Sequence, residues 1–431
     1  MRILVVGGGG REHALCHALL SENPSAVLHA APGNPGTASL AHNLAIAPDD
    51  IDRIADAADM LGSDLVVVGP EAPLAAGLAD RLRAEGRAVV GPNAAAAQLE
   101  ASKAFAKDVM AHAKVPTAPS ETFSDLDQAL GYIDAHAEPL VVKASGLAGG
   151  KGAIVCATRR EAAAAVGSML RERRFGAAGS VIVIETFLEG EELSVLGLTN
   201  GTEIEFLPPA QDHKRLLDGD RGPNTGGMGA YSPVALATPE LLARVRDQVC
   251  LPVLAELDRR GTPFSGVLYA GLMVGPTGDV SVVEFNCRLG DPEAQVVLPL
   301  LEGGLTDAFW QIAHGDAPAR LPVAERAAVT TVLAARGYPD TPEKGAAIAI
   351  PADLPDGVTV FHAGTVLDAD GTLRVAGGRV LTVTATAQSF TEAQEHSREA
   401  AARIDFAGKQ FRSDIGWREQ ERRTEASWRV R

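Results

Sequence analysis

Cysteine is scarce in this chain of 431 residues, and it is never clustered. Four cysteines, Cys16, Cys156, Cys250 and Cys287, are widely spaced and form no C-x-x-C pair. This spacing argues against a disulfide scaffold and against a zinc module, and it favours a reducing compartment. We therefore expect a cytoplasmic protein.

The chain also lacks long apolar runs and an excess of basic residues. No stretch of about 18 apolar residues occurs, which argues against a membrane span. An apolar strand follows directly after Arg2, so we expect no signal peptide. The net charge of −16 argues against general nucleic-acid binding. A local basic pocket for a phosphorylated metabolite stays compatible with this charge.

Short apolar strands alternate with helical segments from residue 2 to about residue 100. Residues 3–6, 65–68 and 88–90 are the expected strands, and each ends at a loop that contains glycine. The alternation predicts a doubly wound parallel sheet with helices on both faces. Ligands of such sheets bind beyond the carboxyl ends of the strands, where these loops lie.

The whole chain is expected to be an α/β multidomain protein, because its length accommodates two to four packed domains. Two further units with strands and glycine-rich loops follow the N-terminal sheet. A small α+β domain without obvious chemistry comes last. The expected boundaries are 1–103, 104–190, 191–325 and 326–421, with a charged and frayed tail at 422–431.

The run V-V-E-F-N-C-R-L-G-D-P-E at residues 282–293 is the most informative segment. Its apolar start predicts a β-strand, on which Glu284 and Asn286 point to the same face. One carboxylate and one amide oxygen form an incomplete set of hard ligands, which suits Mg²⁺ completed by waters and substrate phosphates. A polar face of an edge strand is the alternative. Cys287 should point to the opposite face, into the core.

A run of glycines, Gly7 to Gly10, follows the first strand and opens a helix. Glycines let backbone N–H groups approach an anion, and the helix N-terminus adds positive potential. A dinucleotide site is the rival interpretation. Glu12, however, stands where the third glycine of G-x-G-x-x-G would fall, and residues 30–33 lack the acidic residue that would hold a ribose. We expect phosphate or sugar-phosphate binding here.

A second glycine-rich loop, K-A-S-G-L-A-G-G-K-G at residues 143–152, joins two expected strands. It differs from a Walker A loop, because Gly146 and Gly150 are one residue too close and Gly152 replaces the hydroxyl residue. Lysines at both ends favour a lid over nucleotide phosphates. A solvated hairpin with incidental lysines is the alternative.

A third candidate combines Q-D-H-K-R at residues 211–215 with a glycine-rich loop that runs to Tyr231. Cationic side chains beside backbone N–H groups suit a phosphate. A charged surface turn is the alternative. His213 receives no acid–base role.

Together these segments resemble the phosphoribosylamine–glycine ligase family of the ATP-grasp superfamily. The resemblance spans nearly the whole chain, to D-I-G-W-R at 414–418. It rests on strings such as G-G-G-G-R-E-H-A, G-P-E-A-P-L, K-A-S-G-L-A-G-G-K-G, Q-D-H-K-R, P-N-T-G-G-M-G-A-Y-S-P and E-F-N-C-R-L-G-D-P-E. Ser145 departs from the Asp of many bacterial members, which bears on the loop contacts. Gly149 and Leu289 replace the usual Ala and Phe, which are mild packing changes.

The resemblance implies an ATP-grasp fold and an ATP-dependent carbon–nitrogen ligase of purine biosynthesis. The family joins glycine to 5-phosphoribosylamine through glycyl phosphate, giving glycinamide ribonucleotide, ADP and phosphate. It also implies Mg²⁺, with Mn²⁺ as the alternative, on Glu284 and Asn286. A monomer or weak homodimer is expected.

Two rival classes differ from this interpretation. Another ATP-grasp ligase, such as a biotin carboxylase or a D-alanine ligase, is disfavoured by Q-D-H-K-R and P-N-T-G-G-M-G. A non-catalytic nucleotide sensor is disfavoured because Glu284 and Asn286 are both present.

The resemblance finally implies a set of site residues. Those expected to bind ATP are Lys103, Lys143, Gly149, Gly150, Lys151, Glu185, Phe187, Leu188, Glu191 and Glu192. Those expected to surround phosphoribosylamine and glycine are Gly10, Arg11, Glu12, Asp212, Lys214, Arg215, Thr225, Gly226, Gly227, Arg288 and Asp291. Catalysis is assigned to Lys151, Arg288, Asp212 and Asp291, and the two aspartates are the candidates for the ammonium group of glycine.

Overall fold

The N-terminal domain is a five-stranded parallel sheet, as its alternating pattern predicts. The computed structural model describes residues 1–429 and gives the strand order β3-β2-β1-β4-β5. Every neighbouring pair in this sheet is parallel. The strands are β1 (Arg2–Gly7), β2 (Val27–Pro32), β3 (His42–Asn43), β4 (Leu65–Val68) and β5 (Ala88–Val90).

Different parts of the chain cover the two faces of this sheet. Alternate side chains of a strand point to opposite faces, so Leu4 and Val6 belong to one buried cluster and Ile3 and Val5 to another. Helices α2 (Ile51–Met60) and α4 (Leu78–Ala84) contribute to the first cluster, and α1 (Gly10–Glu22) and α12 (Leu305–Ala313) to the second. The second face is therefore completed from far along the sequence.

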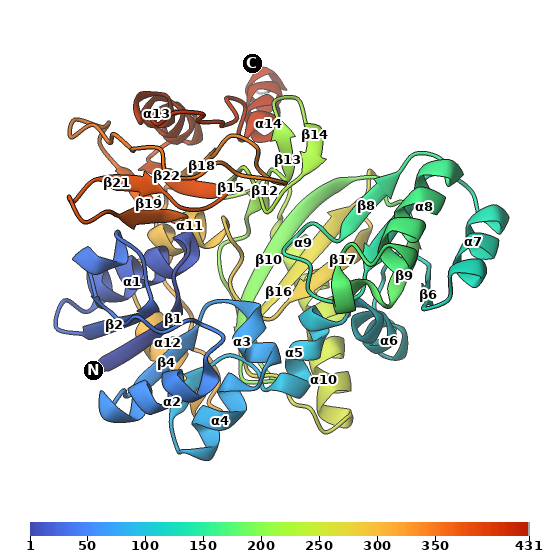
Figure 1. Ribbon diagram of the computed structural model, residues 1–431, viewed down its shortest axis with the longest axis horizontal. Coiled ribbons are helices and arrows are strands. Elements are labelled where there is room, and N and C mark those ends of the chain that lie inside the picture. Colours follow the sequence, from blue (N-terminus) through green and yellow to red (C-terminus); the bar gives the residue numbers. More distant parts are fainter. Residues whose placement is uncertain (430–431) are drawn as a thin grey trace.

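Two antiparallel four-stranded sheets form the central part of the chain, drawn in green and yellow in Figure 1. The first has the order β6-β9-β7-β8 and the second β11-β10-β16-β17. The strands of the first are β6 (Ser120–Phe123), β7 (Leu140–Ala144), β8 (Ala153–Cys156) and β9 (Ile182–Thr186). Those of the second are β10 (Glu191–Thr199), β11 (Ile204–Phe206), β16 (Gly266–Val274) and β17 (Val280–Asn286).

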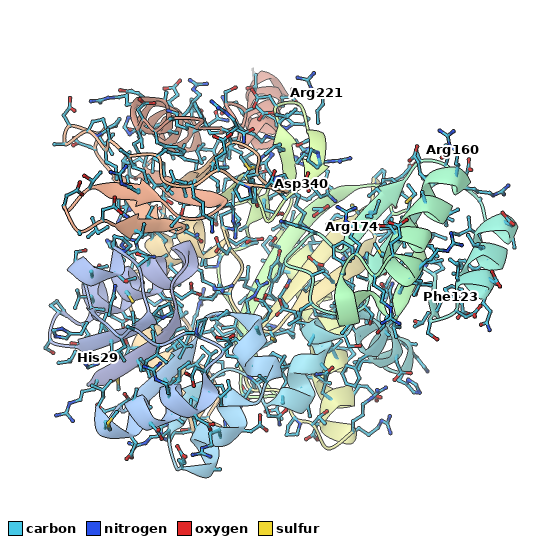
Figure 2. The ribbon with its side chains drawn as sticks, viewed as in Figure 1. His29, Phe123, Arg160, Arg174, Arg221 and Asp340 are labelled. Atoms are coloured by element: carbon cyan, nitrogen blue, oxygen red, sulfur yellow. The ribbon has the colours of Figure 1, made fainter. Side chains whose placement is uncertain are left out.

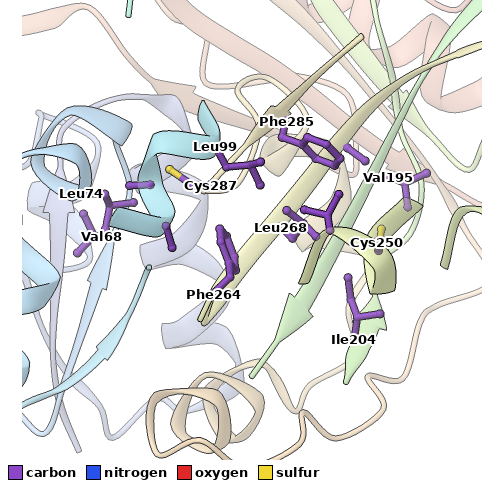
Figure 3. Packing of buried hydrophobic residues seen from close by; sticks show 14 of the residues in the cluster. Val68, Leu74, Leu99, Val195, Ile204, Cys250, Phe264, Leu268, Phe285 and Cys287 are labelled. Carbon is purple, nitrogen blue, oxygen red and sulfur yellow. The ribbon is translucent and has the colours of Figure 1, made fainter. Parts of the chain in front are cut away.

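Helices pack on both central sheets. Helices α7 (Leu126–Ala135) and α8 (Arg159–Val166) bury their apolar side chains against the first sheet. The second sheet shares a core with α5 (Ala94–Ala101), α6 (Lys103–Ala113), α9 (Pro239–Val245) and α10 (Leu251–Arg259). Figure 3 shows Leu99, Phe264 and Leu268 in this core. The core continues to Val68 and so joins the central part to the N-terminal sheet.

A further five-stranded sheet forms the C-terminal domain, at the top left of Figure 1. Its order is β12-β15-β18-β22-β19, and all pairs are antiparallel. The strands are β12 (Gln211–Asp212), β15 (Gly229–Ser232), β18 (Ala327–Ala334), β19 (Val358–His362) and β22 (Arg379–Ala387), with α13 (Phe390–Arg403) packed on β18 and β22. Since β12 and β15 precede residue 326, the boundary expected there cuts across this sheet.

The charged end of the chain is helical rather than frayed, which corrects our expectation. Helix α14 runs over Trp417–Arg429, and residues 430–431 of the expected tail lie outside the described residues. The buried Glu419 accepts a hydrogen bond from the backbone of Ala235 at 3.1 Å and pairs with Arg423 at 2.8 Å. The charged side chains thus find fixed partners. Within residues 1–429 no helix is both long and apolar enough to cross a bilayer.

Candidate active site

A cavity of about 480 Å³ lies where all parts of the chain meet. Its walls come from the N-terminal domain, both central sheets and the C-terminal sheet. It brings together most of the residues that the sequence predicts, namely Arg11, Lys103, Lys143, Gly149, Gly150, Glu185, Phe187, Leu188, Glu192, Asp212, Lys214, Thr225, Gly226, Glu284, Asn286, Arg288 and Asp291. The predicted residues outside its lining are Gly10, Glu12, Lys151, Glu191, Arg215 and Gly227.

The expected metal pair lies on β17, which pairs with β16. Glu284 and Asn286 both line the cavity, as their spacing of two residues predicts. Burial alone would raise the pKa of Glu284, but Lys214, Lys143 and Lys103 lower it below its usual value. Its carboxylate is therefore ionised and suited to a hard cation. Within residues 1–429, no group of three or more His, Cys, Asp or Glu side chains is arranged to hold a metal ion.

Cys287 is buried behind the metal pair, as expected, and has a partner there. Its thiol contacts Oε2 of Glu100 at 3.1 Å, and its backbone N–H donates to the same oxygen at 2.7 Å. Burial raises the pKa of the Cys287 thiol, and Glu100 raises it further. This thiol is therefore protonated and unsuited to act as a nucleophile.

One end of the cavity is lysine-rich and surrounds Glu185. The Glu185 carboxylate pairs with Lys143 at 2.7 Å and with Lys107 at 3.0 Å. Burial lowers the pKa values of Lys103 and Lys107, against the opposing effect of acidic neighbours. Lys107 was not among the residues predicted from the sequence. Its position four residues after Lys103 on α6 was the available signal, because such residues share one helix face.

The glycine-rich loop between β7 and β8 reaches over this end of the cavity. Gly149 and Gly150 line the cavity with φ of +57° and +76°, a conformation that favours glycine. The ammonium group of Lys151 donates to the carbonyl of Pro339 at 2.5 Å instead of lining the cavity. Oγ of Ser145 accepts from the N–H of Ala104 at 3.1 Å. Ser145 therefore fixes the base of the loop to α6.

Two neighbouring glutamates on β10 point in opposite directions. Glu192 lines the cavity, and its Oε2 lies 2.5 Å from Nζ of Lys214. Glu191 forms an ion pair with Arg422 on α14. Of the two candidates for a ribose, only Glu192 is therefore placed at the cavity. Sequence alone could not choose between them, because either register of the strand satisfied the pattern.

In the D-H-K-R segment, too, neighbouring side chains point alternately toward the cavity and away from it. Asp212 and Lys214 line the cavity, whereas His213 is buried and its Nε2 accepts from the N–H of Gly416 at 2.8 Å. Arg215 donates to the carbonyl of Gly222 at 2.6 Å, on the hairpin of β13 (Arg215–Leu217) and β14 (Arg221–Asn224). Alternation along an extended chain separates the two pairs. Arg215 is therefore not placed to contact a ligand in the cavity.

Backbone donors of the loop at 225–227 are already occupied, which differs from our expectation for a phosphate site. The N–H of Thr225 donates to the carbonyl of Lys214 at 2.7 Å. That of Gly226 donates to Oη of Tyr338 at 2.9 Å, and that of Gly227 to Oγ1 of Thr225 at 3.0 Å. An anion in the cavity therefore depends on cationic side chains rather than on these amides.

Glu12 has a similar internal role. Its Oε2 accepts from the N–H of Gly9 at 2.6 Å and caps α1. Its other oxygen binds Nε of Arg11 at 2.6 Å. A Cβ atom at Gly7 or Gly69 would collide with this side chain, so the present position of Glu12 favours glycine at both positions. Glu12 thus orients Arg11, whose side chain faces the cavity.

Arg288 is held by two glutamates that were not predicted from the sequence as site residues. Its Nη2 lies 2.8 Å from Oε1 of Glu100, and its Nε lies 3.3 Å from Oε2 of Glu71. Its Nη2 also donates to Oδ1 of Asn286 at 3.2 Å. Arg288, which follows β17, therefore connects this strand to the N-terminal domain. Only the folded chain brings these residues together.

The pKa values of the two aspartates of the cavity are shifted in opposite directions. Burial raises the pKa of Asp212 well above its usual value, although Lys214 opposes this. Burial also acts on Asp291, but Arg379 and Arg11 lower its pKa below the usual value. Asp291 is therefore the better anionic partner for an ammonium group.

Family models and known relatives match nearly the whole chain. Three family models match in order: the Phosphoribosylglycinamide synthetase N domain at residues 1–100, its ATP-grasp (A) domain at 101–294 and its C domain at 328–418. The phosphoribosylamine–glycine ligase of Nostoc sp. is 48% identical over 426 residues, covering 97% of this chain and 99% of that protein.

Solved structures extend the comparison to the fold. The phosphoribosylamine–glycine ligase of Thermotoga maritima has a TM-score of 0.85 and 33% identity, covering 96% of this chain and 100% of that chain. A biotin carboxylase domain of the Hydrogenobacter thermophilus 2-oxoglutarate carboxylase has a TM-score of 0.71 and 18% identity, covering 95% and 91%. This second likeness is one of fold alone. The chain belongs to the phosphoribosylglycinamide synthetase family and has the ATP-grasp fold.

Proposed function

We propose that this chain ligates glycine to 5-phosphoribosylamine at the expense of ATP and forms glycinamide ribonucleotide, ADP and phosphate. The observation that carries this proposal is the shared cavity. Lysines for nucleotide phosphates, the Glu284 and Asn286 pair, and arginines for a second anionic substrate all line it. The reaction is the one for which the curated relatives are named.

The chemistry begins from an unreactive carboxylate. A carboxylate oxygen of glycine takes the γ-phosphoryl group of ATP, which gives glycyl phosphate and ADP. The amine nitrogen of phosphoribosylamine then attacks the carbonyl carbon and loses a proton. Phosphate leaves with the oxygen that came from glycine. Positioning and charge neutralisation dominate such steps, since the protein forms no covalent bond.

ATP is assigned to the lysine-rich end. Lys103 and Lys143 neutralise its phosphates, and Glu192 receives the ribose hydroxyls. Glu185, Phe187 and Leu188 hold the adenine. The apolar lining of this end supports that placement, with Met110, Val141, Val155, Met273 and Phe285 in its walls. Lys151 can reach the phosphates only after it leaves the carbonyl of Pro339.

ATP-grasp enzymes use ATP with a divalent metal ion. We assign that ion to Glu284 and Asn286, which fit a hard cation because they offer only oxygen atoms. The ion supplies positive charge beside the phosphate oxygens when it is bound. We propose Mg²⁺ with Mn²⁺ as a substitute. A structure of similar fold, the Hydrogenobacter thermophilus domain, is a complex with MgADP.

The small substrates are assigned to the arginine-rich end. Arg11 and Arg288 face the phosphate of phosphoribosylamine, and Asp291 faces the ammonium group of glycine. Asp212, the other candidate for this ammonium group, lies near enough to Lys214 for their charges to interact. We revise the assignment of Lys214 toward the nucleotide, because its ammonium group lies beside Glu192 and Glu284.

The proposal extends to organisation and location. The unit boundaries at 103 and 190 remain part of it, as does a monomer or weak homodimer. The boundary at 325 cuts across the C-terminal sheet, and the one at 421 falls within α14. A cytoplasmic location is proposed because all four cysteines are free and buried.

Release of ADP tests the function. With ATP and Mg²⁺, release should require both glycine and freshly prepared phosphoribosylamine, and mass spectrometry should detect glycinamide ribonucleotide in equal amount. ADP release that instead depends on bicarbonate with biotin, or on D-alanine, would assign the chain to another ATP-grasp reaction.

A further inference from the structure

The C-terminal domain reaches the cavity through Arg379, the first residue of β22. From the sequence we expected no chemistry in this domain. Nη1 of Arg379 donates to the carbonyl of Asp291 at 2.7 Å, and Nη2 lies 3.2 Å from its carboxylate. The same Nη1 also donates to the carbonyl of Gly226. One guanidinium group therefore joins two loops of the cavity.

The peptide of Gly226 is held at both ends by the C-terminal domain. Arg379 binds the carbonyl, and Oη of Tyr338 accepts from the N–H at 2.9 Å. A Cβ atom at Gly226 would lie 3.3 Å from both of these side chains, so the close approach favours glycine. The position of this loop is thus set from outside the central sheets.

The carboxylate of Asp291 is fixed in a comparable way. Nε2 of Gln295 donates to Oδ1 at 2.8 Å, and Arg379 binds Oδ2. With one oxygen on each partner, the carboxylate has a defined orientation. An arginine achieves this with two groups of one planar fork, whereas a lysine offers a single charge.

We propose that Arg379 is a positioning residue for the binding of glycine. It orients Asp291 toward the ammonium group of glycine and fixes the loop at 225–227 beside it. This assignment rests on the proposed function, and it gives the C-terminal domain a role in substrate selection. Lys103 and Lys143, which are assigned to the ATP phosphates, lie on α6 and β7, and Arg379 bonds to neither element. Binding of ATP should therefore depend on Arg379 much less than binding of glycine does.

Steady-state kinetics with three variants test this role. Arg379→Met should raise the KM for glycine by about tenfold or more, with the KM for ATP within about twofold of the unmodified protein. Arg379→Lys should recover part of the loss, because it keeps the charge without the fork. Arg374→Met is the matched control, because Arg374 pairs with Asp368 on an exposed hairpin away from the cavity.

Thermal melting separates folding from positioning. If Arg379→Met fails to fold, Arg379→Lys and Tyr338→Phe take its place and must raise the KM for glycine selectively. An equal rise in the KM for ATP, or a KM for glycine unchanged from the Arg374→Met control, would overturn the assignment. Absence of glycine-dependent ADP release already in the unmodified protein would refute the proposed function itself, which keeps the two failures distinct.

Discussion

The ammonium group of Lys214 lies 2.5 Å from the carboxylate of Glu192. It is also 3.8 Å from Glu284. Burial alone would lower the pKa of Lys214, but Glu192, Asp212 and Glu284 together raise it well above its usual value. A protonated Lys214 therefore connects Glu192, the proposed partner of the ribose, to Glu284 on β17. This geometry supports the proposal that Lys214 contacts the nucleotide.

Replacement of Lys214 by methionine should impair use of ATP. A charge-assisted hydrogen bond contributes about 1.5–3 kcal/mol, so the KM for ATP should rise by roughly ten- to a hundredfold. The KM for phosphoribosylamine should change much less. Arg215→Met is the control, since Arg215 bonds to Gly222 outside the cavity. A larger effect of Arg215→Met, or a selective effect of Lys214→Met on phosphoribosylamine, would restore the assignment made from sequence.

Local patterns predicted β17 and the N-terminal sheet correctly. Spacing of two on a strand was enough to place Glu284 and Asn286 together, because this periodicity depends on the backbone alone. The same periodicity could not tell which of Glu191 and Glu192 faces the cavity, because that choice depends on which neighbour covers each face. Arg422 on α14 covers Glu191.

Long-range contacts account for what sequence reasoning missed. Arg379 and Tyr338 contact the loop at 225–227 only because the C-terminal sheet includes β15 and therefore lies against this loop. Arg288 likewise depends on Glu71 and Glu100 from the N-terminal part. No local motif records such pairs. Glycine-rich loops also suggested free backbone donors, whereas the folded chain uses them internally.

Removal of the charge of Glu284 should abolish ligation. In Glu284→Gln the metal pair keeps its shape but loses its only formal negative charge, so Mn²⁺ binding, followed by electron paramagnetic resonance in the presence of ATP, should weaken by about tenfold or more. Glu302→Gln, at an exposed position, is the control. Normal Mn²⁺ affinity and normal turnover in Glu284→Gln would remove Glu284 from the metal site.

The loop at 145–152 should exchange its amide hydrogens more slowly once nucleotide is bound. Its glycines favour no single conformation, and the proposed partner that orders the loop is ATP. Hydrogen exchange measured by mass spectrometry, with and without ATP, checks this expectation. The β18–β22 pair is the internal reference, because it lies in the C-terminal sheet. Equal protection of the loop in both states would argue against a lid.

Asp220 should stabilise the fold in a pH-dependent way. His213, together with Arg412 and Arg418, holds its pKa well below the usual range, against the effect of burial. The arginines make the close contacts, at 2.8 and 2.6 Å, whereas Nδ1 of His213 is 3.8 Å away. Because the pKa is lowered in the folded state, the stabilisation is present above the unfolded pKa and is lost as the pH falls.

The variant Asp220→Asn should therefore lower the free energy of unfolding by about 1–3 kcal/mol at neutral pH. The difference from the unmodified protein should shrink below about pH 4, near the unfolded pKa of Asp. Urea titrations across this range measure it, with the exposed Asp316→Asn as control. A difference that stays constant with pH would show that charge on Asp220 is not the cause.

Transfer of oxygen from glycine to phosphate tests the central claim most directly. Glycine labelled with ¹⁸O in its carboxylate is turned over with ATP and phosphoribosylamine, and the released phosphate is analysed by mass spectrometry. Ligation through glycyl phosphate predicts that each phosphate carries a single ¹⁸O atom and that the product amide keeps the other. Unlabelled phosphate, released at the same rate as ADP, would contradict the account.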